Sequence, residues 1–156
     1  MRKTFRIVVI FFLLVFIVIQ FFQPDKNISE DSSSHILETE QVPDNIKTIL
    51  TNACLDCHSN NTNYQWYHKP APVSWIVNKH IVTGKEEVNL SDWGEFDIFD
   101  KLGTLEEMCT ETKRKTMPLK SYTTIHRKAK LSDEQIAEFC DWSEKLGEEL
   151  LKSMKE

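Results

Sequence analysis

The chain is poor in glycine, with only 4 among 156 residues, and these are scattered. No glycine-rich loop of the kind that cradles phosphates is therefore available. No stretch shows a convincing alternation of apolar and polar residues typical of strands, and no segment repeats. These absences favour an all-α protein without a phosphate-binding loop.

Basic residues are also scarce where a nucleic-acid-binding face would need them. All 24 acidic residues follow the apolar run at the N-terminus, whereas Arg2, Lys3 and Arg6 precede it. The part of the chain after Phe22 is therefore net acidic, which argues against nucleic acid as a partner. An acidic balance suits a soluble domain that meets basic partners or stays dispersed.

The most specific motif is the run Cys54-Leu55-Asp56-Cys57-His58. Two cysteines three positions apart can each add across a vinyl group of haem, and the histidine directly after them then serves as an axial ligand of the iron. A Cys-x-x-Cys pair alone would also fit a thioredoxin-like dithiol, which would need a βαβ context, or half of a zinc site. The adjoining His58 favours one covalently attached haem c, with its iron bound by that histidine.

Residues 7–22 form a nearly unbroken apolar run that follows the three basic residues. Sixteen helical residues fall somewhat short of the roughly 30 Å hydrocarbon core of a membrane. The run is followed by no small-residue site for a signal peptidase, which favours an uncleaved anchor over a cleavable signal. A buried core helix is disfavoured because the run is apolar all round.

We therefore predict a cytoplasmic start and membrane anchor at 1–22. The positive charge before the run keeps the N-terminus in the cytoplasm. Residues 23–42 are polar and lack apolar periodicity, so we expect a flexible tether there. The haem c-binding domain then occupies 43–156. The protein is expected to be single-pass in the cytoplasmic membrane, with this domain in the periplasm, the side on which haem c is attached.

Within the domain, apolar spacing predicts helices that begin near Pro43, Pro72, Thr104 and Ser132, the last two opened by capping boxes. The helix after Pro72 carries an apolar stripe, and Gly84 is placed to end it. The stripe consists of Val73, Ile76, Val77, His80 and Ile81.

The second face of the iron also needs a ligand or an explanation. Met117 is favoured because it precedes a proline, lies outside the predicted helices and comes late enough for the chain to return over the haem. Met108 sits on a helix stripe and Met154 at a fraying terminus, so both are poorer candidates. His80, His126 or an open site are the alternatives, and His68 completes the set of candidates.

Aromatic residues follow the motif closely, and Tyr64, Trp66 and Tyr67 could wrap the haem edge or be ordinary surface residues. We expect the second ring nitrogen of His58 to donate to a backbone carbonyl, with Pro70 or Pro72 as the neighbour.

Taken together, several motifs and their order resemble the bacterial haem-binding domain family of cytochrome c-like proteins, common in Bacteroidetes. The matching residues are Cys54-x-x-Cys57-His58-Ser59-Asn60, Trp66-Tyr67, Ala71-Pro72-Val73-Ser74-Trp75, Asn89-Leu90-Ser91-Asp92-Trp93, Met117-Pro118, Tyr122, His126 and Trp142. The resemblance implies a mainly α-helical, cytochrome c-like fold, covalent haem c and Met117 opposite His58. We expect Trp66, Trp75 and Tyr122 to contact the cofactor. Leu119 departs from the family, which usually has a second proline there.

Cys109 and Cys140 lie outside this family pattern, each on a helix stripe. In an oxidising compartment they could be bonded to each other, or they could be two buried thiols packed as small apolar groups.

The simplest function for such a chain is a membrane-anchored monohaem c-type cytochrome that carries single electrons, without catalysis, between redox partner proteins of unknown identity. The alternative is a haem-based sensor or peroxidase-like enzyme whose distal ligand can be displaced.

Overall fold

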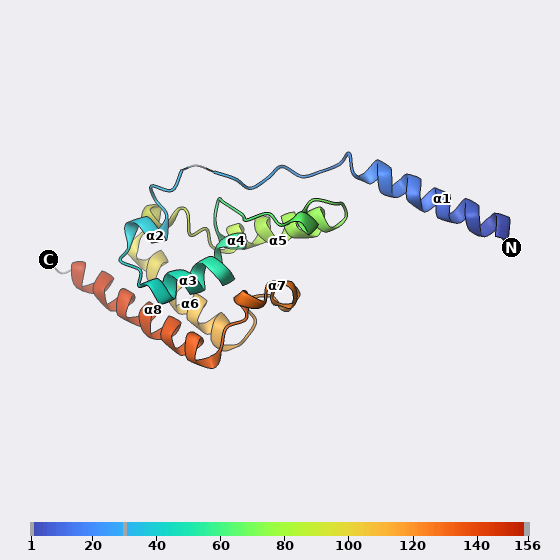
Figure 1. Ribbon diagram of the computed structural model, residues 1–156. Coiled ribbons are helices and arrows are strands. Elements are labelled where there is room, and N and C mark those ends of the chain that lie inside the picture. Colours follow the sequence, from blue (N-terminus) through green and yellow to red (C-terminus); the bar gives the residue numbers. More distant parts are fainter. Residues whose placement is uncertain (1, 30, 155–156) are drawn as a thin grey trace.

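The computed structural model describes residues 2–29 and 31–154, and their regular structure is entirely helical (Figure 1). The prediction of an all-α fold is confirmed. In chain order the elements are α1 (Arg2–Ile19), α2 (Ile36–Thr39), α3 (Asp44–Ala53), α4 (Leu55–His58), η1 (Trp66–His68), α5 (Val73–Glu87), η2 (Trp93–Glu95), α6 (Ile98–Lys113), α7 (Lys120–Ile125), η3 (Arg127–Ala129) and α8 (Asp133–Ser153).

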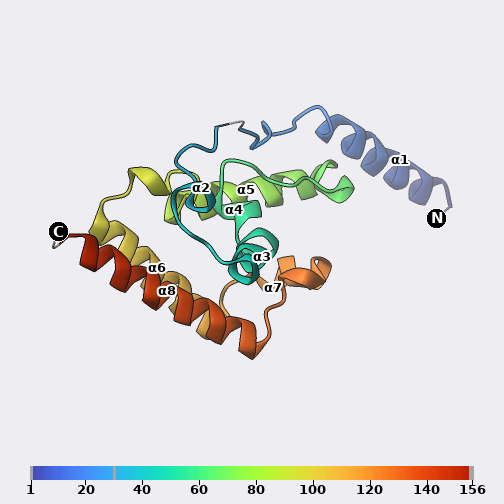
Figure 2. The same cartoon turned by 60° about the vertical axis from the view of Figure 1, so that its left-hand side comes forward.

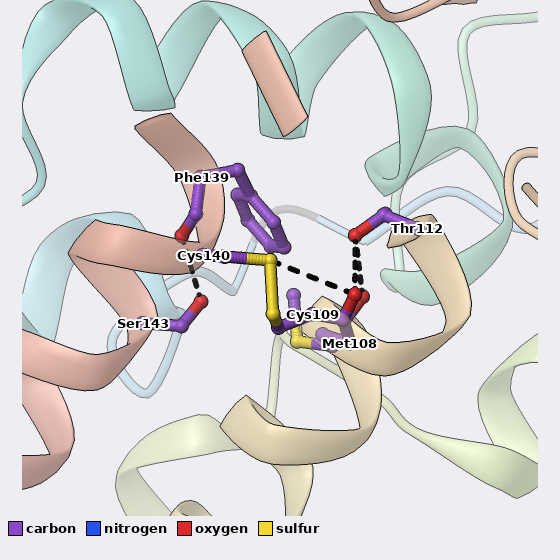
Figure 3. The surroundings of a disulfide bond; sticks show 6 residues. All are labelled: Met108, Cys109, Thr112, Phe139, Cys140 and Ser143. Carbon is purple, nitrogen blue, oxygen red and sulfur yellow. Dashed lines mark hydrogen bonds between the residues drawn. A yellow bond between two sulfur atoms is a disulfide. The ribbon is translucent and has the colours of Figure 1, made fainter. Parts of the chain in front are cut away.

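Helices α6 and α8 lie side by side and antiparallel along one side of the domain (Figures 1 and 2). A disulfide between Cys109 of α6 and Cys140 of α8 joins them (Figure 3). Of the two states that the sequence left open for these cysteines, the bonded one is therefore present. Further along the pair, Gly147 packs against Leu102, which allows the two helices to approach closely.

Helix α3 covers the α6–α8 pair and connects it to the motif. Its apolar residues fall on one face, as their spacing predicted, and Ile46, Ile49 and Leu50 are buried. They form one core with Trp93 and Phe139, both fully buried. Because burying a large apolar side chain stabilises a fold by about 1.5–3 kcal/mol, this core fixes the end of α3 at which the motif begins.

The segment 23–42 differs from the predicted flexible tether. Ile36 is fully buried in the core, and α2 begins where the Nδ1 atom of His35 accepts a hydrogen bond from the Leu37 amide. Asn27 donates through Nδ2 to the carbonyl of Ser59 and to Thr62 Oγ1, at 2.8 and 2.9 Å. Apolar periodicity is absent here because the segment contacts the domain through single residues rather than through a regular apolar face.

Two helix boundaries also differ from the predictions. Helix α6 begins at the N-cap Asp97 and runs through Gly103, so Thr104 does not open it. Gly84 does not end α5, which continues to Glu87. The capping box between Ser132 and Gln135 at the start of α8 is confirmed.

Helix α1 extends from the domain at one end of the molecule and buries none of its residues (Figures 1 and 2). Among the described residues, no helix combines the length and the apolar character needed to cross a membrane. A membrane-crossing helix at the predicted anchor 1–22 is therefore not supported.

Candidate haem-attachment site

The motif begins where α3 ends. The chain bends at Cys54, whose backbone φ of −121° and ψ of −50° break the helix, and α4 restarts at once. The carbonyl of Cys54 accepts hydrogen bonds from the amides of Cys57 and His58, at 3.1 and 2.9 Å. One helical turn thus places Cys54, Cys57 and His58 on the same side of α4. Both thiols are free and half-buried.

Helix α5 packs directly on this turn through Gly84. A Cβ atom on Gly84 would lie 2.8 Å from the carbonyl oxygen of Cys57 and 3.3 Å from its Cβ. Only glycine therefore allows this approach of the two backbones. The role of Gly84 is close packing against the motif rather than the helix stop that its position suggested.

The end of α5 also holds His58. The Nδ1 atom of His58 lies 3.1 Å from the carbonyl oxygen of Val88. A carbonyl only accepts, so Nδ1 carries the proton and the lone pair of Nε2 stays available to a metal. The expected backbone carbonyl is present, but it belongs to Val88, and the predicted neighbours Pro70 and Pro72 are wrong. The carbonyl of His58 in turn accepts from the Leu90 amide at 2.8 Å.

A network of polar side chains fixes the segment that presents Val88. The side-chain oxygen of Asn60 accepts from Lys85 Nζ at 3.1 Å and from Asn89 Nδ2 at 2.9 Å. Asn60 donates its backbone amide to Ser91 Oγ and its side-chain amide to Asp92. This network ties the residues after His58 to the segment after α5. No sequence pattern indicated this network, although the two runs Ser59-Asn60 and Asn89-Leu90-Ser91-Asp92 contain all but one of its members.

The electrostatics of the thiols differ from those of a redox dithiol. Burial, with a smaller contribution from Cys57, raises the pKa of Cys54 to about 12. Burial, with a smaller contribution from Asp56, raises the pKa of Cys57 to about 11. Dithiol oxidoreductases instead lower the pKa of the attacking cysteine to stabilise its thiolate. This arrangement therefore disfavours the thioredoxin-like alternative.

Tyr122 connects the motif to the chain that follows Met117. Its hydroxyl donates to the Asp56 carboxylate at 2.7 Å, and its ring stacks on His126 with 4.0 Å between centroids. Burial, and then the hydrogen bond to Asp56, raise the pKa of Tyr122. The Tyr67 hydroxyl lies within hydrogen-bond distance of Nε2 of His126. These contacts connect Asp56, which lies between the two cysteines, through Tyr122 and His126 to Tyr67 in η1.

Met117 lies in the non-helical segment between α6 and α7, as predicted. The backbone at Lys115 has a left-handed φ of 58°, which ends α6, and the amides of Thr116 and Met117 both donate to the carbonyl of Glu111. The helix end therefore sets the position of Met117, and its side chain is 36% exposed. In α7, which follows this segment, Tyr122 contacts α4 through its hydrogen bond to Asp56.

The other candidate ligands occupy less suitable positions. Met108 packs against the core, as its place on a helix stripe indicated, and Met154 is exposed at the end of α8. His68 is buried, with its Nδ1 accepting from the Gln65 amide. His126 is occupied by its stacking on Tyr122 and its contact with Tyr67, and His80 is half-buried on α5.

The face of α5 that contacts the motif is apolar and partly uncovered. Val73, Val77 and His80 recur at helical spacing on the same face as Gly84, which contacts Cys57. Val73 remains 38% exposed, and Ile76 beside it 55%. A flat apolar group attached at the two cysteines would cover this face, so the residues present fit a haem.

Trp66 and Trp75, two of the predicted haem contacts, are both exposed. Trp66 is 77% exposed, and its ring contacts the edge of Tyr67. Trp75 projects from α5 and donates its indole N–H to the Phe22 carbonyl at 2.6 Å. A cavity of about 670 Å³ lies between α4 and α7, lined by Leu55, Asp56, Tyr122 and His126 among others, but not by Cys54, Cys57, His58 or Met117.

Within the described residues, no three His, Cys, Asp or Glu side chains gather as a group that could hold a metal ion. What the fold provides is an all-helical domain in which one histidine, oriented for a metal, adjoins two free thiols. A family model for the haem-binding domain matches residues 14–145, and the chain belongs to this family. Neither a curated protein nor a solved structure matches the chain.

Proposed function

We propose that this protein is a monohaem c-type cytochrome that carries single electrons. The observation that carries the proposal is the position of His58, whose Nδ1 is held by the Val88 carbonyl so that Nε2 is available beside Cys54 and Cys57. Membership of the haem-binding domain family supports the cofactor itself. Each thiol would form one thioether bond by addition of its S–H across a vinyl group.

The residues around the motif have separate tasks in this proposal. Val88 orients the imidazole of His58, and the Asn60 network holds Val88. Met117 would supply a thioether sulfur to the iron, and the apolar face of α5 would keep water away from the cofactor. When bound, haem supplies one-electron chemistry by cycling of its iron between the ferric and ferrous states. A protein that keeps both axial positions filled leaves no open site for catalysis, so electron transfer is favoured over peroxidase chemistry.

Covalent attachment is tested by haem staining of denaturing gels and by a pyridine haemochrome spectrum, on the full chain made in a host able to attach haem c. We expect a stained band of about the mass of the chain. Cys54→Ser and Cys57→Ser should each shift the haemochrome band of the attached haem because one thioether is lost. Cys109→Ser, which removes a cysteine outside the motif, should leave that band unchanged. A colourless wild-type chain in which both Cys54 and Cys57 react with iodoacetamide would refute the proposal.

The distal ligand is tested by Met117→Ala. A weak ferric absorption band near about 695 nm is expected for methionine bound to haem iron, and the substitution should abolish it and lower the reduction potential. Met108→Ala is the matched control because Met108 packs in the core. Retention of the band in Met117→Ala would show that another residue is the ligand, and a high-spin wild-type spectrum would favour the sensor or peroxidase-like alternative.

We also propose that the domain lies outside the cytoplasm, attached to the membrane through residues 1–22. The disulfide between Cys109 and Cys140 supports an oxidising compartment. The exposed apolar side chains of α1 and the basic residues before them support export and membrane contact. Removal of residues 2–22 from a chain exported by another signal should release the domain into the periplasmic fraction. A domain that stays in the membrane fraction after this removal would contradict the attachment.

A further inference from the structure

The charges of this acidic chain are unevenly distributed. The whole chain has a formal net charge of −5, yet residues 113–130 contain seven Lys or Arg residues and no Asp or Glu. All seven are exposed. They are Lys113, Arg114, Lys115, Lys120, Arg127, Lys128 and Lys130, and we name the stretch 113–130 the basic segment.

Few of these charges are paired. Lys115 lies 2.7 Å from Asp133, and Arg114 lies 3.5 Å from Glu111, both in exposed positions. None of the other five forms an ion pair with a described residue. Exposed pairs are screened by water, so even the two paired cations contribute to the potential outside the protein. The basic segment therefore keeps a positive field on a protein that is negative elsewhere.

The basic segment lies next to the haem-attachment motif. It includes Met117 and α7, and Tyr122 of α7 is hydrogen-bonded to Asp56 between the two motif cysteines. Apart from the proposed ligand Met117, the apolar side chain of Ile125 is exposed within it, at 60%. An exposed apolar side chain with charged residues around it is typical of a transient protein interface. The apolar side chain packs against the partner, and the surrounding charges orient the partner as it approaches. A solvated helix end alone would not require that the charges continue through α7 and η3.

We propose that the basic segment is the docking surface for an acidic face of a redox partner protein. This inference rests on the proposed electron-transfer function and names the chemistry of its partner. The net charge of the chain had instead suggested basic partners. The positive charge of the basic segment, next to the motif, reverses that expectation. Attraction between complementary charged patches raises the association rate and selects the orientation.

The test uses the full, haem-loaded chain in a nonionic detergent. The patch variant combines Lys120→Glu, Arg127→Glu and Lys128→Glu. The control variant combines Lys47→Glu, Lys145→Glu and Lys152→Glu, which changes the net charge equally at exposed positions on α3 and α8. In the first measurement, a polyglutamate peptide is titrated into the ¹⁵N-labelled protein at low salt. We expect shifts confined to amides of 113–130, retained in the control variant and lost in the patch variant.

In the second measurement the reduced chain gives one electron to hexacyanoferrate(III), which becomes hexacyanoferrate(II). The patch variant should react at least about tenfold more slowly than the control variant at low salt, and the difference should shrink at high salt because salt screens exposed charges. If both variants behave alike in the two measurements, the docking surface is wrong. A chain that binds the peptide through the basic segment but exchanges no electron would refute the proposed function alone.

A third measurement separates protein from lipid. The chain is mixed, without detergent, with vesicles of phosphatidylcholine, with or without phosphatidylglycerol, and floated. Because α1 is proposed to attach every variant to both kinds of vesicle, the quantity compared is the increase in flotation that phosphatidylglycerol causes. If the patch substitutions abolish this increase while the polyglutamate titration shows no effect, the basic segment binds anionic lipid and the acidic protein partner is wrong. An equal increase for both variants, together with the expected peptide shifts, supports the protein partner.

Discussion

Gly84 provides a quantitative test of how the motif is held. In Gly84→Ala the new Cβ would lie 2.8 Å from the carbonyl oxygen of Cys57, and this neighbour is backbone that cannot rotate away. Overpacking of this kind costs about 1–3 kcal/mol, whereas alanine gains about 1 kcal/mol over glycine inside a helix. The net effect should be a fall in the free energy of unfolding of up to about 2 kcal/mol. The yield of attached haem should fall too, because α5 would move away from α4 and carry Val88 with it.

Gly103→Ala is the matched control. Gly103 also lies inside a helix, but nothing lies within 4 Å of a Cβ built there, so alanine should stabilise α6 by up to about 1 kcal/mol. Urea unfolding followed by circular dichroism measures both variants, with the midpoint compared at equal slope. The two substitutions should have opposite signs. If Gly84→Ala is as stable as Gly103→Ala and attaches haem normally, α5 does not position the motif through this contact.

Three further predictions concern stability. Replacing Cys109 and Cys140 by serine opens a loop with a sequence separation of 31, so the unfolding free energy should fall by about 3–4 kcal/mol in urea titrations; a loss below about 1 kcal/mol would contradict this. Tyr122→Phe removes a hydrogen bond to a half-buried carboxylate, Asp56, and should cost about 1–2 kcal/mol in the same assay, with no change disproving the bond's contribution. Burial lowers the pKa of His35 from 6.5, so the unfolded chain takes up the proton first and stability falls as the pH drops below about 6.5. His35→Asn keeps a helix cap without titrating, and its stability should depend less on pH in this range than that of the wild type.

The motif could be found from sequence because its chemistry requires consecutive residues. Two thiols and an imidazole must lie within one helical turn, and this requirement produces a recognisable sequence motif. The backbone carbonyl that orients His58 cannot be recognised in the sequence, because every residue has a carbonyl and Val88 contributes no side-chain group. The sequence predicted a helix end at Gly84. The close approach of Gly84 to Cys57 depends instead on how α4 and α5 cross. Spacing along one chain does not contain that information.

The apolar stripe of α5 shows a second limit. Helical spacing correctly placed Val73 and Val77 on one face, yet the face is only partly covered by protein. An apolar stripe indicates that an apolar group covers the helix face. It does not show whether that group is a neighbouring helix or a flat cofactor. The reverse applies to Ile36, which is fully buried although the surrounding segment has no periodic pattern. A single buried side chain can attach a polar segment to the core, and periodicity cannot detect it.

Different contacts position the two candidate iron ligands, His58 and Met117. We therefore expect partial unfolding to affect them differently. On the side of His58, α5 packs on α4 through Gly84, and the Asn60 network reinforces the contact. On the side of Met117, the sulfur is presented by the end of α6, and α6 is joined to α8 by the disulfide at Cys109. Beyond Met117, Tyr122 of α7 bonds to Asp56 of the motif and η3 packs on α3. Because Met117 lies in an exposed, non-helical segment, partial destabilisation should release Met117 while His58 stays in place.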